Sequence, residues 1–553
     1  MNFDILVRML VETIRAGFLN RVRTYRFIFT LAFIIMLCYA LIPPADALYA
    51  TYALYDNYNN PYRGVYNSAW VGTIMALQTS IWLSLFGFYI INDAIKRDED
   101  TKVGEILATT QLKNPIYILA KFITNIAILG AMSFIILIMS GLLQIFRSEV
   151  YHLDLVSLIV PFVILVIPVI FFVSGAALFF ETFPVLRGTW SNIVWFFFWM
   201  FLMMTILIFD PFISWLSSSI RAAAYSQYPN IIFPSANFGL NPISQPAKLF
   251  LWNDVFSLWR FEVIIFRFFW YISALILAFT SIFFFHRFDP SVDRGISITH
   301  KISSLLATDT PVILETEDEH QIPLTTAERI VIPVNTLEKV TSTPLKSGID
   351  HFRFGTIFIA ETELMFKTVP IWWYLVTFGL IIAGLLIPIE ISQRFLLPIS
   401  LIWPLFIWSK MGTRESLNGT YQLIFSSNNV LIRQFPAIWL SGVLVALFSC
   451  SGFIVNLALN GYSINFLLTV FIGILFIPTM ALCFGVWTGT NKFFELIYFL
   501  YWYIGSLNGV TLLDFAGTTP EAVAAGLFRF YTLFTVLLLV LAFIGRRRQI
   551  NSM

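Results

Sequence analysis

Apolar segments long enough to form membrane helices recur along the whole chain, separated by shorter polar connections. A helix needs about 20 apolar residues to cross roughly 30 Å of hydrocarbon. In order, the segments cover residues 27–43, 71–92, 119–146, 156–180, 190–209, 264–286, 371–390, 395–410, 436–459, 464–488, 494–512 and 526–545. The pattern predicts an all-α polytopic membrane protein of about 12 transmembrane helices, arranged as two pseudo-equivalent six-helix halves.

The distribution of basic residues predicts the orientation of these helices. The chain is 58% hydrophobic and only 12% charged, and its net charge of +2 says little, because position matters more than the sum. Basic residues gather before the first segment, after the second segment, and at the C-terminus in Arg546-Arg547-Arg548, whereas the loop 44–70 has only Arg63. By the positive-inside rule, both termini and the loop after the second segment are expected to be cytoplasmic.

Three stretches outside the apolar segments have recognisable character. Leu6, Leu10, Ile14 and Phe18 recur every four positions, which predicts an interfacial amphipathic helix, although any juxtamembrane helix has this pattern. The segment 210–262, rich in Trp and Pro, is expected to be external and to contain re-entrant or interfacial helices. Residues 288–352 are polar and acidic and are interpreted as a cytoplasmic linker or small β-rich insert. The predicted units are 1–287, 288–352 and 353–553.

Familiar catalytic and metal-binding patterns are absent from the sequence. It contains no GxxxxGK[ST], HExxH or GxSxG motif, its three cysteines lie in apolar segments without metal-ligand spacing, and its five histidines do not cluster. The chain is therefore not expected to be an enzyme or to bind a metal or cofactor itself. Its ionisable residues fall near segment ends, which disfavours an ion-coupled transporter and a charged pore.

One polar pattern occurs twice, with a constant separation of 317 positions and no gap. In each half it lies between the second and third apolar segments. The first copy comprises Arg97, Asp98, Glu105, Ile106, Leu107, Thr109 and Thr110. The second comprises Arg414, Glu415, Gln422, Leu423, Ile424, Ser426 and Ser427. A duplicated unit with the same loop in the same place suggests two pseudo-equivalent docking points for a symmetric partner.

These loops resemble the coupling-helix region of type-2 ABC transporter permeases, where the usual string is close to R-E…G-T-x-E-x-L-L-x-[ST]-P…K. The whole chain then looks like two such permeases fused in tandem. Three departures stand out: Gln111 and Asn428 replace the usual proline, Lys102-Val103 replaces Gly-Thr in the first copy, and Ile438 replaces the downstream lysine that is Lys121 in the first. The second copy lacks this lysine, so equal coupling at both loops is not assured.

The resemblance implies a permease subunit of an ATP-driven ABC transporter, an exporter by analogy, in a prokaryotic plasma membrane. ATP would be bound by a separate P-loop ABC ATPase, expected in two copies per chain, with a short amphipathic helix of each loop in a cleft of one ATPase. Ile106-Leu107 and Leu423-Ile424 would make the apolar contacts, and the charged and amide residues of the two copies the polar ones. Closing the ATPase pair would tilt the two halves against each other and open a path between them.

The sequence does not identify the substrate. Polar residues of the second segment are candidates to line a cavity, namely Gln78, Thr79, Ser80 and Ser84, although such side chains more often bond to backbone or pack against neighbours. An apolar or amphiphilic substrate is favoured, because the segment interiors offer nothing for a strongly charged one. Two alternative functions stay open, an ion-coupled secondary transporter and a non-transporting scaffold or sensor that uses residues 288–352 as its interaction module.

Overall fold

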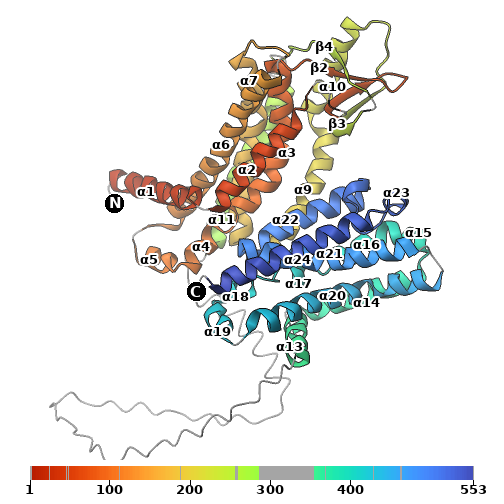
Figure 1. The fold of residues 1–553 in the computed structure, drawn as a ribbon. Helices are drawn as coiled ribbons and strands as arrows, with labels where there is room; N and C mark the ends of the chain where they lie inside the picture. Colours follow the sequence, from red (N-terminus) through yellow and green to blue (C-terminus); the bar gives the residue numbers. More distant parts are fainter. Residues whose placement is uncertain are drawn as a thin grey trace, which may run out of the picture. The chain divides into compact units, whose positions relative to one another are not determined.

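The computed structural model describes residues 3–285 and 354–551, apart from positions 24, 45, 46, 48, 111, 148, 187, 244, 256–259, 368, 428 and 461–463. The described residues 3–285 and 358–551 belong to one compact unit. The predicted insert at 288–352 lies outside the described residues. The described part is mostly helical (Figure 1), and it is a helical membrane protein by the length and composition of its helices.

The helices of the N-terminal part follow the apolar pattern closely. They are α1 (Phe3–Val22), α2 (Tyr25–Leu41), α3 (Ser68–Ile91), α4 (Ala94–Asp100), α5 (Val103–Thr109), α6 (Asn114–Arg147), α7 (Leu155–Pro161), η1 (Phe162–Val166), α8 (Ile167–Thr182), η2 (Pro184–Leu186), α9 (Thr189–Phe209), α10 (Pro211–Gln227) and α11 (Phe261–Phe284). Side-chain caps define several starts. Asn67 accepts a hydrogen bond from the Trp70 amide at the start of α3, and Asp154 accepts one from Val156 at the start of α7.

The helices of the C-terminal part have a similar order. They are α13 (Phe354–Lys367), α14 (Ile371–Leu386), α15 (Ile389–Ile391), η5 (Ser392–Leu396), α16 (Leu397–Ile402), α17 (Leu405–Trp408), α18 (Arg414–Leu417), α19 (Tyr421–Phe425), α20 (Val430–Leu459), α21 (Ile464–Thr488), α22 (Asn491–Tyr501), η6 (Trp502–Leu507), η7 (Thr511–Leu513), α23 (Pro520–Ala524) and α24 (Phe528–Asn551). Helix α1, expected as an interfacial helix, packs on α6, and α24 lies along α21.

Among the described residues, eight helices are long and apolar enough to cross a membrane, or ten if two bent helix pairs each count as one span. One pair, α9 and α10, bends by 49° next to Asp210. Asp210 accepts a hydrogen bond from the Phe212 amide at 3.0 Å and pairs with Arg267 of α11 at 2.8 Å. The other pair is α13 and α14, bent by 100°. Of the twelve predicted segments, 27–43 is the 17-residue helix α2 and 494–512 contains α22, η6 and η7, so the count of twelve stays a prediction.

A four-stranded sheet, which the sequence pattern did not predict, connects the loops 44–66 and 235–250. Its strands are β1 (Tyr49–Tyr55), β2 (Pro61–Gly64), β3 (Ser235–Pro242) and β4 (Lys248–Phe250), in the order β3-β1-β2-β4. Strand β1 is antiparallel to β2 and β3, and β2 is parallel to β4. Helix α10 fits the expectation of an additional helix in segment 210–262.

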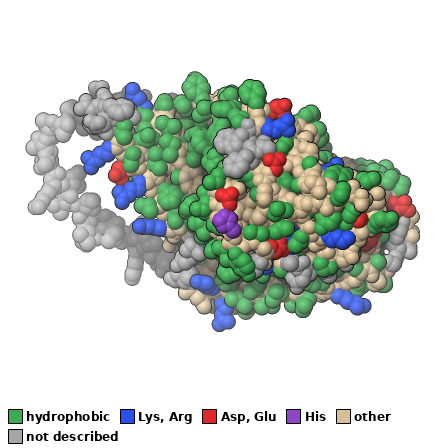
Figure 2. All heavy atoms as spheres, turned by 90° about the horizontal axis from the view of Figure 1, so that it is seen from above, with side chains coloured by type: hydrophobic (Ala, Val, Ile, Leu, Met, Phe, Trp, Pro, Cys, Tyr) green, Lys and Arg blue, Asp and Glu red, His purple; other side chains and the backbone are tan. Residues whose placement is uncertain are grey.

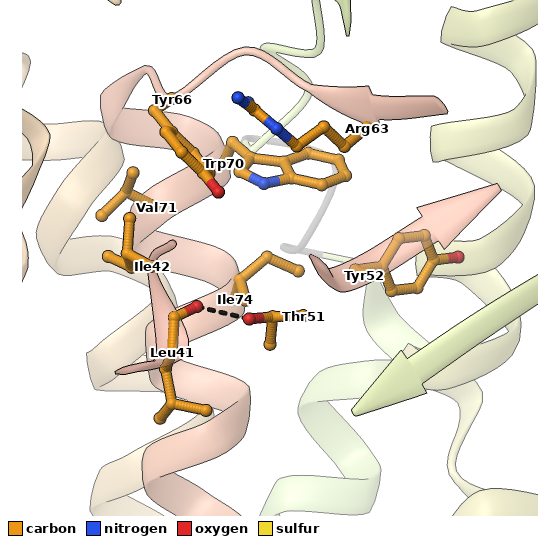
Figure 3. Close-up of a pocket in the computed structure, with 9 residues that line it drawn as sticks. All are labelled: Leu41, Ile42, Thr51, Tyr52, Arg63, Tyr66, Trp70, Val71 and Ile74. Carbon is orange, nitrogen blue, oxygen red and sulfur yellow. Dashed lines mark hydrogen bonds between the residues drawn. The ribbon is translucent and has the colours of Figure 1, made fainter. Parts of the chain in front are cut away.

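A small pocket of about 10 Å³ lies where α2 leads into this sheet (Figure 3). Leu41, Thr51, Arg63 and Trp70 are among the residues that line it, and the Thr51 hydroxyl donates a hydrogen bond to the Leu41 carbonyl. This volume is about that of a single water molecule.

On the face drawn in Figure 2, hydrophobic side chains are spread widely between a few scattered charged ones, as expected for a chain with exposed apolar helix faces.

Close helix contacts through glycine hold the C-terminal part together. A Cβ at Gly452 of α20 would lie 2.0 Å from the carbonyl oxygen of Ile381 in α14. We expect Gly452→Ala to lower stability by roughly 1–3 kcal/mol, because backbone atoms must move apart. Thermal unfolding in detergent checks this. Gly130→Ala in α6 is the matched control, since nothing lies within 4 Å of its added Cβ. Equal melting temperatures for the two variants would contradict the packing.

Candidate functional site: two loops of paired short helices

The two sequence-matched loops have the same local build. The first loop, residues 93–113, contains α4 and α5 between α3 and α6, and the second loop, residues 409–429, contains α18 and α19 between α17 and α20. The turn between the two short helices includes Lys102 in the first loop (φ +57°) and Gly419 in the second (φ +65°), both left-handed and 317 positions apart. The departure from glycine at Lys102 therefore leaves the turn unchanged, at some conformational cost. The sequence predicted one short helix per loop, and the structure has two.

Matched side chains close the ends of these short helices. Thr109 and Thr110 donate from their hydroxyls to the carbonyls of Ile106 and Leu107, at 2.8 and 2.7 Å. Ser426 and Ser427 do the same to Leu423 and Ile424, both at 2.9 Å. Upstream, Thr101 donates to the Arg97 carbonyl at 2.8 Å and Asn418 to the Arg414 carbonyl at 2.9 Å. The predicted site residues Thr109, Thr110, Ser426 and Ser427 thus terminate the second short helix of each loop, and Thr101 and Asn418, which were not predicted, terminate the first. Together these bonds fix the shape of each loop.

One acidic residue of each loop, at matched positions, is bonded to the helix that follows the loop. Asp98 accepts a hydrogen bond from the Tyr117 hydroxyl at 2.7 Å, and Glu415 accepts one from the Gln434 amide at 3.1 Å. Tyr117 and Gln434 are again 317 positions apart. These two anchoring residues were missed from the sequence, although extending the register beyond the loop would have found them.

The cations that neutralise these acids come from different places. Lys121 of α6 pairs with Asp98 at 2.7 Å. In the second loop, where Ile438 replaces the lysine, Arg546 of α24 pairs with Glu415 instead, and its guanidinium also lies 4.6 Å from the centre of the Phe425 ring. Each acid is thus paired with a cation, but the two cations do not lie at matched sequence positions.

The two arginines of the loops have different surroundings. Arg414 pairs with Glu361 of α13 at 2.9 Å. For Arg97, one terminal nitrogen is buried with no hydrogen-bond partner among the described residues. Glu12-Thr13 in α1 is the same residue pair as Glu361-Thr362 in α13, but Glu12 is exposed. Asp98, Glu415 and Arg414 therefore make contacts within the chain, where the sequence predicted contacts with a partner.

Exposed apolar side chains stand out on the second short helix of each loop. Ile106 is 66% exposed and Leu423 is 78% exposed, at matched positions. The residue after each, Leu107 or Ile424, is half-buried, and the residue before each, Glu105 or Gln422, is exposed. Val103 of α5 is also exposed, at 41%. A short helix that places large apolar side chains in the open beside polar groups has the form expected of a contact that a partner covers.

The four residues proposed to line a cavity are occupied by bonds within the chain. Thr79 and Ser80 donate to the carbonyls of Met75 and Ala76. Gln78 accepts a hydrogen bond from the Trp82 indole at 3.0 Å, and the Ser84 hydroxyl accepts one from Trp199 at 2.9 Å. The structure thus gives these residues the packing role that the sequence left open as the alternative.

A set of buried polar contacts lies at the break between α3 and α4, beside the first loop. Glu181 of α8 accepts hydrogen bonds from the amides of Ala94 and Ile95 at the start of α4. Lys492 of α22 pairs with Asp93 at 2.7 Å. In the sequence, Asp93 and Glu181 are marked only as ionisable residues near segment ends. No local signal marks Lys492, which is 400 positions from Asn92.

No group of three or more His, Cys, Asp or Glu among the described residues could hold a metal ion. The three free cysteines Cys38, Cys450 and Cys483 are buried. No protein-family model, curated protein or solved structure matches this chain.

Proposed function

We propose that this chain is the membrane subunit of an ATP-driven ABC transporter, an exporter that works with a separate ATPase bound at the two loops. The observation that carries the proposal is the repeated loop: each copy has two short helices, a left-handed turn, an anchored acid and an exposed apolar side chain at the same matched position, Ile106 or Leu423. Two such surfaces on one chain suit a partner of two equivalent subunits. The chain itself would hydrolyse nothing, and ATP would be bound by the partner.

A second line of support is a set of repeated contacts between helices. The indole of Trp195 in α9 donates to the Ser84 carbonyl, and the hydroxyl of Tyr498 in α22 donates to the Leu401 carbonyl. Trp199 donates to the Ile81 carbonyl and Trp502 to the Pro398 carbonyl. In both cases the acceptors are 317 positions apart and the donors 303. One constant pair of separations supports two pseudo-equivalent six-helix halves.

Contacts between α9 and α22 support a pseudo-twofold relation of these halves. Asn192 donates to Glu495 at 2.6 Å, and the rings of Phe196 and Phe499 stack with centroids 4.2 Å apart. Within each pair the residues are 303 positions apart, so each residue meets its own counterpart, as at an axis of twofold symmetry. Closing an ATPase pair under the two loops would move the halves about this contact and alter a path between them.

The remaining parts of the proposal concern the setting. The chain would lie in a prokaryotic plasma membrane with both termini and both loops in the cytoplasm, following the positive-inside rule. The lipid bilayer is its surroundings, and an apolar or amphiphilic substrate suits the uncharged centres of the helices.

Purification tests the proposal directly. We expect gentle extraction of the full chain from its native membrane to bring a P-loop ATPase with it, in a ratio of two ATPase subunits per chain, because each loop offers one docking point. Native mass spectrometry of the complex measures the ratio. Recovery of the folded chain with no nucleotide-binding protein, under conditions that keep known membrane complexes intact, would contradict the proposal.

A second candidate function, ion-coupled transport, is favoured by one observation. Glu181 and Glu495 are both buried carboxylates, and Glu495 is 0% exposed. Buried acids near membrane helices are typical of ion-binding steps. Transport by the purified chain in liposomes under an ion gradient without ATP would favour this candidate over the first.

A further inference from the structure

Side chains of α1 and α8 form hydrogen bonds to the junction between α3 and α4. Asp93 adopts a left-handed conformation there (φ +81°), which separates α3 from α4 at the start of the first loop. Arg21 of α1 donates to the carbonyls of Ile90 and Ile91, both at 2.8 Å. Glu181 accepts from the first amides of α4. Any displacement of α4 must therefore disturb these contacts.

Lys492 links this junction to α22, in the other half of the chain. Its ammonium lies 2.7 Å from the Asp93 carboxylate and donates to the Asn92 carbonyl at 2.7 Å. One turn further along α22, Glu495 accepts a hydrogen bond from Asn192, which itself accepts one from the Asn92 side chain at 3.2 Å. Asn192 and Glu495 are almost completely buried. Two routes thus join the start of the first loop to α22.

The second loop is held differently. The residues that match Asn92 and Asp93 are Ser409 and Lys410, 317 positions later. The Ser409 hydroxyl donates to the Phe406 carbonyl at 3.4 Å, within the same half. The ion pairs of this loop, as far as the structure describes the chain, join it to α13 and α24, also in the same half.

We propose that Lys492 is a positioning residue that couples the first loop across the chain to α22, so that the two loops are not equivalent. This inference rests on the proposed function and adds to it. Movement of the first loop is passed through Asp93 and Lys492 to the contact between α9 and α22, whereas movement of the second loop is passed to its own half. Removing Lys492 leaves the docking surface intact but interrupts this transmission.

The test uses the distance between α9 and α22 as its readout. Phe196→Cys and Phe499→Cys are introduced together in a chain whose three native cysteines are replaced by alanine, with a protease site inserted between residues 288 and 352. After treatment with a short bifunctional thiol reagent and cleavage at the inserted site, the two fragments stay joined only if the cysteines have reacted. The complex with its ATPase is compared without nucleotide and with MgATP and vanadate.

In the double-cysteine chain that keeps Lys492, we expect trapping with vanadate to change the cross-linking rate by about fivefold or more. With Lys492→Met the response should fall below about twofold, while ATPase recovery stays unchanged. Lys492→Arg should retain most of the response, and Lys367→Met, which breaks an exposed ion pair with Glu363, should retain all of it. Asp93→Asn should act like Lys492→Met.

The outcomes separate the two proposals. A full nucleotide response in Lys492→Met, with the ATPase bound, overturns the role of Lys492 and leaves the proposed function standing. Absence of any ATPase from the complex in every background, including the chain with Lys492, overturns the proposed function and this inference with it.

Discussion

Replacing Ile106 and Leu423 together by glutamate is expected to reduce the recovery of the ATPase with this chain by at least about tenfold, because an apolar contact at the centre of an interface commonly contributes about 2 kcal/mol or more. The two side chains are 66% and 78% exposed in the chain alone. Their replacement should therefore leave stability within about 0.5 kcal/mol. Quantitative pull-down of the ATPase with the tagged full chain measures the effect.

The matched control for Leu423→Glu is Ser416→Glu. Ser416 is exposed in the second loop, and the residue 317 positions earlier, Glu99, is also exposed and already carries a carboxylate. This control adds the same charge to the loop without removing an apolar side chain. The single variants Ile106→Glu and Leu423→Glu then report whether each loop binds an ATPase. Full ATPase recovery with a folded double variant would rule out docking at these helices.

Arg546→Met is expected to destabilise the chain by about 3–5 kcal/mol, since it leaves the Glu415 carboxylate buried without its partner. Glu415 is 4% exposed and Arg546 is 2% exposed. The same substitution removes the contact of the guanidinium with Phe425 of α19. Thermal unfolding in detergent at neutral pH measures the loss. Arg547→Met is the control, because Arg547 is the neighbouring residue in sequence but is exposed.

The pH dependence of this difference identifies its cause. Burial alone would raise the pKa of Glu415, but the ion pair with Arg546 outweighs burial and lowers it below the ordinary value. The pair therefore stabilises the fold above the ordinary pKa of a glutamate, and this contribution is lost as the pH falls through the lowered value. The difference between the chain and Arg546→Met should be largest near neutral pH and shrink as the pH falls below about 4. A difference independent of pH would point to lost packing instead.

The register of 317 positions predicted more of the loops than any single motif did. It placed both loops between the second and third apolar segments, and the structure gives matched positions matched hydrogen bonds, as at Thr109 and Ser426. The prediction of one helix per loop was too simple, because a left-handed residue such as Lys102 is not marked by its type. Lysine is uncommon at positive φ, so the turn could be recognised only from its glycine counterpart.

Long-range partners could not be predicted from local patterns. Arg546 is 131 positions from Glu415, and in the sequence it is one of three consecutive arginines that equally indicate a cytoplasmic end. Only the packing in the structure shows that Arg546 is the buried arginine of the three. The sheet was missed for a related reason, since β2 and β4 are too short for an alternating pattern and are defined by pairing between distant loops.

The glycine contacts around Met411 determine how a force on the second loop is transmitted to the neighbouring helices. A Cβ at Gly485 of α21 would lie 2.0 Å from the Met411 carbonyl oxygen, and one at Gly442 of α20 would lie 2.6 Å from its side chain. Met411 is three residues before α18. The Gly485 contact joins backbone to backbone, and a close-packed interior transmits strain rather than yielding. A force applied at Leu423 would thus pass directly to α21, whereas α20 meets Met411 only through its flexible side chain.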